Sequence, residues 1–397
     1  MKSTCDILGN HIRLIDCRNS DFVTDRVLGI NIDKYFMPSV ANVIGTDLSK
    51  YKLISKGTFA CNPMHVGRDE RLPVALYDGD TPAIISPAYF MFEIINTDVL
   101  NKEYLMMWFR RPEFDRICWL HTDGSVRGGI TWDDICQLEL PVPHIEKQRE
   151  TVKAYKTITE RIELKQKIND NLVEMANALF IDFFIQKAES SDWDEGCFNN
   201  YIVDTVGGDW GQEEPSGNYT EQVSCIRGTD IPALNAGSIS DAPIRYILPK
   251  NLDSKRINAN NMVVEISGGS PVQATGRIAL VPQQVLDYRG SNLICSNFCR
   301  IVTVKPEYVY YFLQHWLYLY RNGRMFNYEN SSTGLKNFDF SSLTEKESIK
   351  LPPEDVVNKF NCLIEPIYNE LFNAGFEIET LKDMKSHILP HIMLNGI

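Results

Sequence analysis

The sequence predicts a duplicated, mixed α/β protein in which two globular domains alternate with two long helices. Three observations support this prediction. Motifs recur about 210 residues apart, short apolar runs alternate with turn residues, and each repeat ends in a heptad pattern. We place the first domain at residues 1–143, the first helix at 144–190, the second domain at 191–352 and the second helix at 353–397.

The duplication is carried by short motifs that occur in the same order in both halves. They are Gly67-Arg68 with Gly276-Arg277, Ser86 with Ser296, Glu103-Tyr104 with Glu307-Tyr308, Trp132-Asp133 with Phe338-Asp339, Leu140-Pro141 with Leu351-Pro352, and Leu179 with Leu389. Each match is weak by itself, but the common order and spacing indicate an internal repeat.

The apolar runs inside each domain predict a sheet that carries a few helices. Runs such as 83–85 and 89–92 are separated by Gly, Pro, Asp and Asn, which is typical of short strands and turns. The aromatic stretches 104–109 and 309–313 lack strict alternation and have helical length with their flanks.

The two long helices carry apolar residues at alternating three- and four-residue steps. The seam includes Ile158, Ile162, Leu172 and Leu179 in the first helix, and Ile364, Leu371, Ile378 and Leu381 in the second. We expect the polar members Lys165 and Asn169 to fix the register. Such a seam is buried only against another helix, so the two helices are predicted to pair with each other.

The direction of this pairing follows from length. A helix over residues 145–185 spans roughly 60 Å, so a helix that returns from the second domain shares the seam only by running antiparallel. The two domains are then related by a pseudo-two-fold rotation. Pro366 predicts a bend or short break near residues 362–366, because proline removes a helical hydrogen bond.

Composition limits the classes of function. The net charge of −12 argues against nucleic-acid binding, but more than half of it lies in the two predicted long helices. We therefore expect weak DNA binding by the isolated chain. The ten cysteines are scattered without a C-x-x-C pair, which predicts reduced thiols and no metal site. No window approaches the roughly 20 apolar residues of a membrane span, which predicts a soluble, cytoplasmic protein.

Catalytic motifs are missing from the sequence. It has no G-x-x-x-x-G-K-[ST] loop for nucleotide hydrolysis, and no Asn/Asp-Pro-Pro-aromatic tetrapeptide of the kind found in amino-methyltransferases. The nearest segment, Asn62-Pro63-Met64-His65, has the wrong third residue. We expect a protein that is not an enzyme and has no catalytic residues.

Two helix ends resemble those of specificity subunits of Type I restriction-modification systems. Residues 176–184 (ANALFIDFF) resemble the end of the family's central helix, and residues 381–393 (LKDMKSHILPHIM) resemble its C-terminal end. The resemblance covers essentially the whole chain. The chain departs from the family in its short N-terminal lead and its acidic second helix.

The resemblance implies a non-catalytic subunit that determines DNA sequence specificity. It implies two target recognition domains, each reading half of an asymmetric site in double-stranded DNA, and paired helices that bind two methyltransferase subunits. Two restriction and motor subunits would complete the complex. S-adenosylmethionine, ATP and Mg²⁺ are then expected on the partner subunits only, and this chain needs no cofactor.

DNA contacts are predicted in polar loops at matching points of the two repeats. The candidates are Arg68, Arg71, Ser125 and Arg127 in the first repeat, and Ser270, Arg277, Ser332, Lys336 and Asn337 in the second. Nearby glycines let the backbone approach phosphate, and an arginine can donate two hydrogen bonds to guanine. Equally, any of these arginines could be a solvated or ion-paired surface residue.

Two other classes of function are open to a duplicated chain of this kind. A protein-binding scaffold explains the duplication and the helices, but not the helix ends that resemble the restriction family. A self-contained nuclease or methyltransferase explains none of these features.

Overall fold

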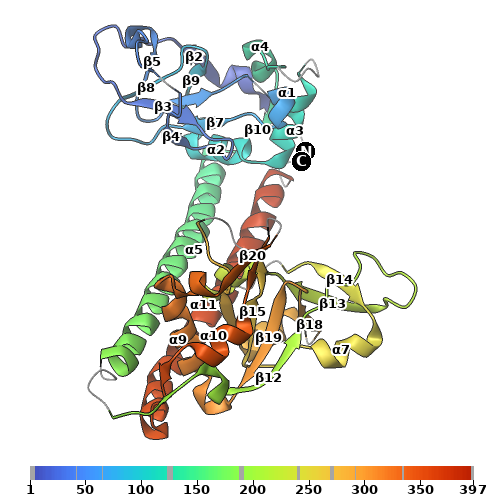
Figure 1. Ribbon diagram of the computed structural model, residues 1–397. Helices are drawn as coiled ribbons and strands as arrows, with labels where there is room; N and C mark the ends of the chain where they lie inside the picture. Colours follow the sequence, from blue (N-terminus) through green and yellow to red (C-terminus); the bar gives the residue numbers. More distant parts are fainter. Residues whose placement is uncertain are drawn as a thin grey trace. The chain divides into compact units, whose positions relative to one another are not determined.

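The computed structural model describes residues 5–41, 43–64, 66–122, 128–186, 192–238, 242–268, 272–290, 292–332 and 335–394 (Figure 1). The chain packs as two compact units. The first contains Met1–Glu160 with Asp383–Ile397, and the second contains Arg161–Lys382. None of the helices among the described residues is both long enough and apolar enough to cross a bilayer.

The first unit contains two four-stranded sheets. One is antiparallel, with the order β2 (Ile12–Ile15), β9 (Phe90–Ile94), β6 (Phe59–Cys61) and β7 (Val74–Leu76). The other has the order β4 (Phe36–Pro38), β3 (Val27–Ile30), β8 (Ala83–Ile85) and β5 (Lys52–Ile54), and its β3–β8 pair is parallel. Strand β1 (Cys5–Ile7) pairs with β10 (Glu139–Pro141).

Short helices complete the first unit. They are α1 (Val66–Asp69), α2 (Lys102–Phe109), α3 (Pro112–Leu120), α4 (Trp132–Cys136), η1 (Leu8–Asn10) and η2 (Leu48–Lys50). Residues 104–109 of α2 are all buried, which explains why this helix lacks an amphipathic pattern in the sequence. Phe59 and Phe92 of the antiparallel sheet stack at 5.2 Å, and Phe109 of α2 packs against both rings. The core therefore lies between α2 and this sheet.

The second unit repeats this arrangement. Its antiparallel sheet has the order β12 (Ile202–Gly207), β19 (Cys299–Val304), β15 (Asn261–Glu265) and β17 (Ile278–Val281). A second sheet has the order β14 (Ile244–Ile247), β13 (Glu221–Ile226) and β18 (Leu293–Cys295), and its β13–β18 pair is parallel. Strand β11 (Glu195–Gly196) pairs with β22 (Ile349–Lys350).

The second unit also has a three-stranded sheet and its own helices. The sheet has the order β16 (Ser267–Gly268), β21 (Leu335–Phe338) and β20 (Glu329–Ser332). The helices are η5 (Phe198–Asn200), η6 (Gly228–Asp230), α6 (Ile231–Asn235), α7 (Pro249–Lys255), α8 (Gln283–Arg289), η7 (Pro306–Tyr308), α9 (Val309–Arg321), η8 (Arg324–Tyr328) and α10 (Phe340–Lys346).

The strand orders confirm the duplication predicted from the motifs. The antiparallel four-stranded sheets of both units place corresponding strands in the same order, and each unit has a mixed sheet with one parallel pair between corresponding strands, β3–β8 in the first unit and β13–β18 in the second. Ser86 follows β8 as Ser296 follows β18, which confirms that motif pair. The fold class is therefore the predicted one, with a mixed α/β unit in each repeat.

The two long helices, α5 and α11, lie within the ranges 144–190 and 353–397 that the heptads predict, of which residues 187–190 and 395–397 lie outside the described part of the chain. Helix α5 (Ile145–Phe180) continues as a π-helical turn, η3 (Ile181–Gln186), and α11 covers Glu354–Leu394. Of the predicted seam residues, Ile162, Ile364, Leu371, Ile378 and Leu381 are buried, and Ile158, Leu172 and Leu179 are half-buried.

Contacts in the second unit show that α5 and α11 run antiparallel. Arg161 and Lys165 of α5 pair with Glu377 of α11, the latter pair at 3.0 Å. Beyond the end of α5, the ring of Phe183 in η3 packs 5.7 Å from the ring of Phe360 in α11. Residue numbers thus rise along one helix as they fall along the other.

The short break predicted near Pro366 is wrong, because α11 is continuous through this position. Proline removes the hydrogen bond to the carbonyl group four residues earlier, at Cys362. Both Pro366 and Cys362 lie on the exposed face of the helix, where water can replace the missing donor. Burial of the opposite face keeps the helix intact across the proline.

Candidate functional site

The two polar loops predicted in the second repeat meet in one small sheet. Strand β16 pairs with β21, which places Ser267 opposite Asn337 and Gly268 opposite Lys336. The Phe338 amide donates to the Ile266 carbonyl oxygen at 2.9 Å and extends this pairing. Residues about 70 apart in sequence therefore share one edge of the second unit.

The corresponding loops of the first repeat also meet. The Gly67 amide donates to the carbonyl oxygen of Gly128 at 3.0 Å, and the Ile130 amide donates to that of Pro63 at 3.2 Å. The bond from Ile130 to Pro63 corresponds to the bond from Phe338 to Ile266 in the second unit. Both repeats thus bring the same two loops together.

Several predicted residues lie outside the described part of the chain. They are Ser125, Arg127 and Ser270. Ser332 is described only through its backbone, as the last residue of β20.

The correspondence of Gly67-Arg68 with Gly276-Arg277 is wrong in register. The Arg277 carbonyl accepts a hydrogen bond from the Glu265 amide at 2.8 Å, just before β17. At the same point before β7, the Pro73 carbonyl accepts from the Asn62 amide at 2.9 Å. Pro73 is therefore the structural equivalent of Arg277, whereas Arg68 lies on α1, in the connection between β6 and β7.

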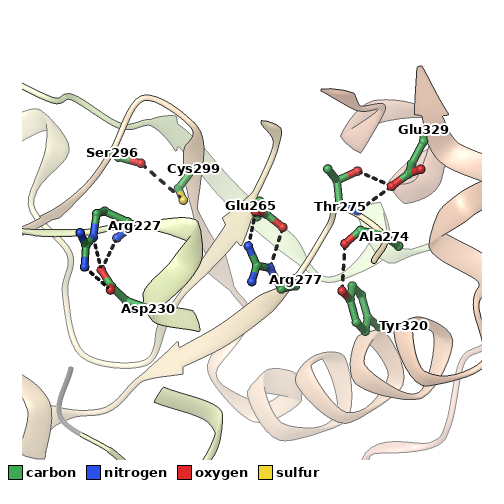
Figure 2. Close-up of polar contacts among 10 residues, drawn as sticks. All are labelled: Arg227, Asp230, Glu265, Ala274, Thr275, Arg277, Ser296, Cys299, Tyr320 and Glu329. Atoms are coloured by element: carbon green, nitrogen blue, oxygen red, sulfur yellow. Dashed lines mark hydrogen bonds and ion pairs between the residues drawn. The ribbon is translucent and has the colours of Figure 1, made fainter. Parts of the chain in front are cut away.

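Arg277 forms a two-point ion pair with Glu265 of the neighbouring strand (Figure 2). Its Nε donates to Oε2 at 2.8 Å and its Nη2 donates to Oε1 at 2.5 Å. The Glu265 side chain is only 2% exposed and that of Arg277 is 13% exposed. The hydrogen bonds that Arg277 donates to Glu265 raise the pKa of Arg277, so this guanidinium stays charged.

Two glycines make room for the Glu265 carboxylate. A Cβ atom at Gly228 would lie 2.7 Å from Glu265 Oε1, and one at Gly268 would lie 2.5 Å from the same oxygen. Gly268 also has a φ of +147°, which side-chain-bearing residues rarely adopt. The carboxylate therefore occupies space that only glycine leaves open on both sides.

The Glu265–Arg277 pair lines a pocket of about 770 Å³ in the second unit. The other lining residues are Trp210, Arg227, Gly228, Thr229, Ser267, Gly268, Gln273, Ser296, Asn297 and Phe298. Asn297 and Phe298, in the turn between β18 and β19, are exposed. Arg227 forms a second two-point pair, with Asp230, at 3.1 and 2.8 Å (Figure 2). The two arginines each face a carboxylate, so the pocket is close to neutral.

The thiols behind this pocket are unreactive at neutral pH. Burial raises the pKa of both Cys225 and Cys299 to about 12, and it also raises the pKa of Cys295 well above its usual value. Cys299 also accepts a hydrogen bond from the Ser296 hydroxyl at 3.7 Å (Figure 2). Within the described residues, no group of three His, Cys, Asp or Glu side chains has a geometry that would hold a metal ion.

Lys336 and Asn337 lie in β21, at the edge of the second unit where β21 pairs with β16. The Lys336 ammonium group donates to Glu329 at 2.8 Å and lies 5.1 Å from the centre of the Phe326 ring. The Asn337 side chain accepts a hydrogen bond from the Ser267 hydroxyl. Glu329 also accepts from the Thr275 amide at 2.6 Å, so it joins the two loops (Figure 2).

The arginines of the first unit are paired as well. Arg68 donates to the adjacent Asp69 at 2.6 and 2.9 Å, and Arg71 donates to Asp33 at 3.1 Å. Arg71 lines a pocket of about 470 Å³, together with Ile32, Asp33, Lys34, Asp69, Glu70, Arg110, Pro112, Asp115 and Arg116. Burial lowers the pKa of Lys34, and the charge of Asp115, 2.7 Å away, opposes that shift.

Sequence reasoning missed the acidic partner in the second unit. Glu265 ends a strand whose residues, Asn261–Glu265, are all buried, and an acidic residue in that position is a signal that could have been noticed. The exposed turn residues Asn297 and Phe298 carry no such signal, because only the fold places them beside Arg277.

Comparisons with known proteins bear on this arrangement. No family model matches the chain. The Type I restriction enzyme MjaIX specificity subunit of Methanocaldococcus jannaschii is 22% identical over 319 residues, which are 77% of this chain and 71% of that protein. The crystal structure of the Type-I restriction-modification system S subunit from M. genitalium matches with a TM-score of 0.58 at 13% identity, over 98% of this chain and 95% of that one. The resemblance predicted from residues 176–184 and 381–393 is thus confirmed, and the chain is similar in sequence and in fold to specificity subunits of Type I restriction-modification systems.

Proposed function

We propose that the chain is the non-catalytic DNA-specificity subunit of a Type I restriction-modification complex. Each compact unit reads one half of a bipartite, asymmetric site in double-stranded DNA. Methyltransferase and restriction subunits dock on the chain and supply the chemistry, with S-adenosylmethionine, ATP and Mg²⁺ bound to those partners.

The observation that carries this proposal is the duplicated loop junction. In both units the same two polar loops meet at one edge, joined by the hydrogen bonds from Ile130 to Pro63 and from Phe338 to Ile266. A chain that contains the same binding surface in two copies suits a ligand with two separate binding sites, such as a bipartite DNA sequence. The first unit has Gly128-Gly129 where the second has Lys336-Asn337, so the two units should read different sequences.

The pairing of the arginines explains why a partner is needed. Arg68, Arg71, Arg227 and Arg277 each donate to a carboxylate, which reduces the positive field that would attract DNA phosphates. Phosphate contacts dominate the affinity of most DNA-binding proteins. We therefore expect tight DNA binding only when methyltransferase subunits are bound.

The long helices offer apolar side chains to such partners. Leu164 and Met175 of α5 are 59% and 48% exposed, and Leu363 of α11 is 49% exposed. Leu164 and Met175 are eleven residues apart, which is about three helical turns, so they lie on one face of α5. We expect a methyltransferase subunit to bind to this face of α5.

Methylome sequencing tests the proposal directly. Cells that carry the complete system should methylate a bipartite DNA motif, and deletion of this chain alone should abolish methylation at that motif. Co-purification from the same cells should recover methyltransferase subunits. Recovery of the chain with other proteins, and an unchanged methylome after its deletion, would instead support the protein-binding scaffold.

A further inference from the structure

We infer that Arg277 reads a guanine in the second half-site and that Glu265 is its positioning residue. This inference rests on the proposed function, and it goes further by naming a base, the side chain that contacts it and the side chain that orients that contact.

One edge of the Arg277 guanidinium group is hydrogen-bonded to Glu265, and we infer that another edge is available to a ligand. Glu265 takes the Nε hydrogen and one Nη2 hydrogen. An arginine carries five N–H donors in a fixed plane, so the outer edge of Arg277 retains two parallel donors, one on Nη1 and the remaining one on Nη2. A guanine presents its O6 and N7 acceptors side by side in the major groove, and two parallel donors match them.

The Arg277 side chain lies where a base edge can reach it. It lines the open pocket of about 770 Å³, whose outer residues include Thr229, Gln273 and Asn297. All three are exposed. Phe298 of the same turn is 50% exposed and offers an apolar surface for a neighbouring thymine methyl group or sugar. If the turn between β18 and β19 enters a groove of the DNA, the base edges in that groove lie next to the pocket.

Stability alone does not account for the Glu265–Arg277 pair. Burial of a carboxylate is costly, and replacing a buried ion pair with apolar residues often leaves stability unchanged. Here the chain also keeps glycine at both Gly228 and Gly268 to make room for the carboxylate. A rigidly held guanidinium favours recognition of a base, because its hydrogen-bonding edge is already oriented before DNA binds.

The competing role for Arg277 is a contact to a DNA phosphate. A phosphate needs only a positive charge nearby, which lysine also provides, whereas reading a guanine needs the two-donor edge. Arg277→Lys therefore separates the two roles. Arg324 provides a matched control, because it donates to the buried Glu347 at 3.1 and 3.2 Å and does not line the pocket.

The experiment uses the chain assembled with its methyltransferase subunits. Kd is measured for DNA that contains the recognised site and for variants in which each base pair of the second half-site is replaced. For the wild-type complex we expect one G·C position to be discriminated through Arg277. Arg277→Lys should reduce the discrimination at that position by roughly 10- to 100-fold and leave the other positions unchanged. Arg324→Lys should change nothing.

The positioning role of Glu265 has its own readout. Glu265→Gln keeps the shape but weakens its hold on Arg277, so it should relax discrimination at the same position while the first half-site is read as before. If a single variant fails to fold, the double variant Glu265→Met with Arg277→Met removes both charges together. It should lose discrimination at the same base-pair position.

Two results would overturn the inference. One is full discrimination at every position by the folded Arg277→Lys and double variants. The other is equal weakening of all DNA sequences by the double variant, with discrimination intact, which would assign Arg277 to a phosphate. Failure of the wild-type complex to recognise any bipartite site would instead refute the proposed function.

Discussion

Asn169 of α5 donates its side-chain amide to the carbonyl oxygen of Ala236 at 3.0 Å, although heptad spacing places it in the seam of the helix pair. The next residue, Gly237, packs against α11, where a Cβ atom at Gly375 would lie 1.8 Å from its carbonyl oxygen. The loop after α6 therefore enters the seam between Asn169 and Gly375. Asn169 and Gly375, which weaken an isolated coiled coil, here hold the two helices against the loop after α6.

Gly375→Ala should destabilise the protein, contrary to the usual effect of this change in a helix. Alanine normally favours a helix by about 1 kcal/mol over glycine, but here its methyl group would overlap the Gly237 carbonyl. Such overpacking typically costs about 1–3 kcal/mol. Urea unfolding measures the effect, and Asn373→Ala on the exposed face is the control. A rise in the unfolding midpoint for Gly375→Ala would show that the loop does not need this contact.

His315 should make the second unit less stable in mild acid. It is buried beside Phe180 and Phe198, and burial lowers its pKa to about 3. Tyr311 donates to the Lys350 carbonyl at 2.6 Å, so we infer that His315 Nδ1 carries the proton it shares with the Tyr311 oxygen, 3.1 Å away.

The sign of the pH effect follows from proton binding. The unfolded chain takes up the His315 proton near pH 6.5, whereas the folded chain resists it down to about pH 3. Stability from this group is therefore complete above pH 6.5 and is lost progressively below it, at up to about 1.4 kcal/mol per pH unit. Urea unfolding at pH 7.5 and 5.5 should show a smaller difference for His315→Gln than for the wild type. Equal differences for the two proteins would exclude His315 as the source.

The ion pairs between α5 and α11 should contribute to the pairing of these helices. Lys165 lies 3.0 Å from Glu377 and 3.8 Å from Glu370, and Arg161 also pairs with Glu377. The hydrogen bond from Lys165, together with that from Arg161, lowers the pKa of Glu377. This contribution is therefore present at neutral pH and is lost as the pH falls through the lowered pKa of Glu377.

Glu377→Gln should lower stability by roughly 0.5–1 kcal/mol at low ionic strength and by less at high salt. Glu379→Gln is the matched control, since Glu379 pairs with Lys382 at 2.8 Å within α11 and does not join the two helices. A double-mutant cycle with Lys165→Met measures the coupling. A coupling energy near zero would mean that the apolar seam alone holds these helices together.

Exchange of residues 1–143 for those of a related protein should alter one half of the recognised DNA motif. The reason is that each unit has its own complete pair of antiparallel and mixed sheets and its own loop junction. Methylome sequencing of cells with the exchanged subunit should find a new first half-site and the original second one. Changes in both half-sites would show that the two units do not read DNA independently.

Much of the fold could be predicted because it depends on short-range patterns. The heptads identified α5 and α11, and the repeated motifs, among them Leu140-Pro141 and Leu351-Pro352, identified the duplication. Pro366 was misjudged because a local rule about proline takes no account of burial on the opposite helix face. The match of Arg68 to Arg277 failed because the two arginines lie at different points of connections of equal length, Arg68 within α1 between β6 and β7, and Arg277 directly before β17.

The sequence by itself therefore determined the two repeats, their long helices and the polar loops between strands, since periodicity and turn residues act over a few positions. Only the tertiary structure decided which of those loops meet and which arginines face a carboxylate. Glu265 reaches Arg277 through the β15–β17 pairing, and Gly228 of η6, distant in sequence, lies next to Glu265. Strand pairing and burial set these contacts, and both arise between segments far apart in the chain.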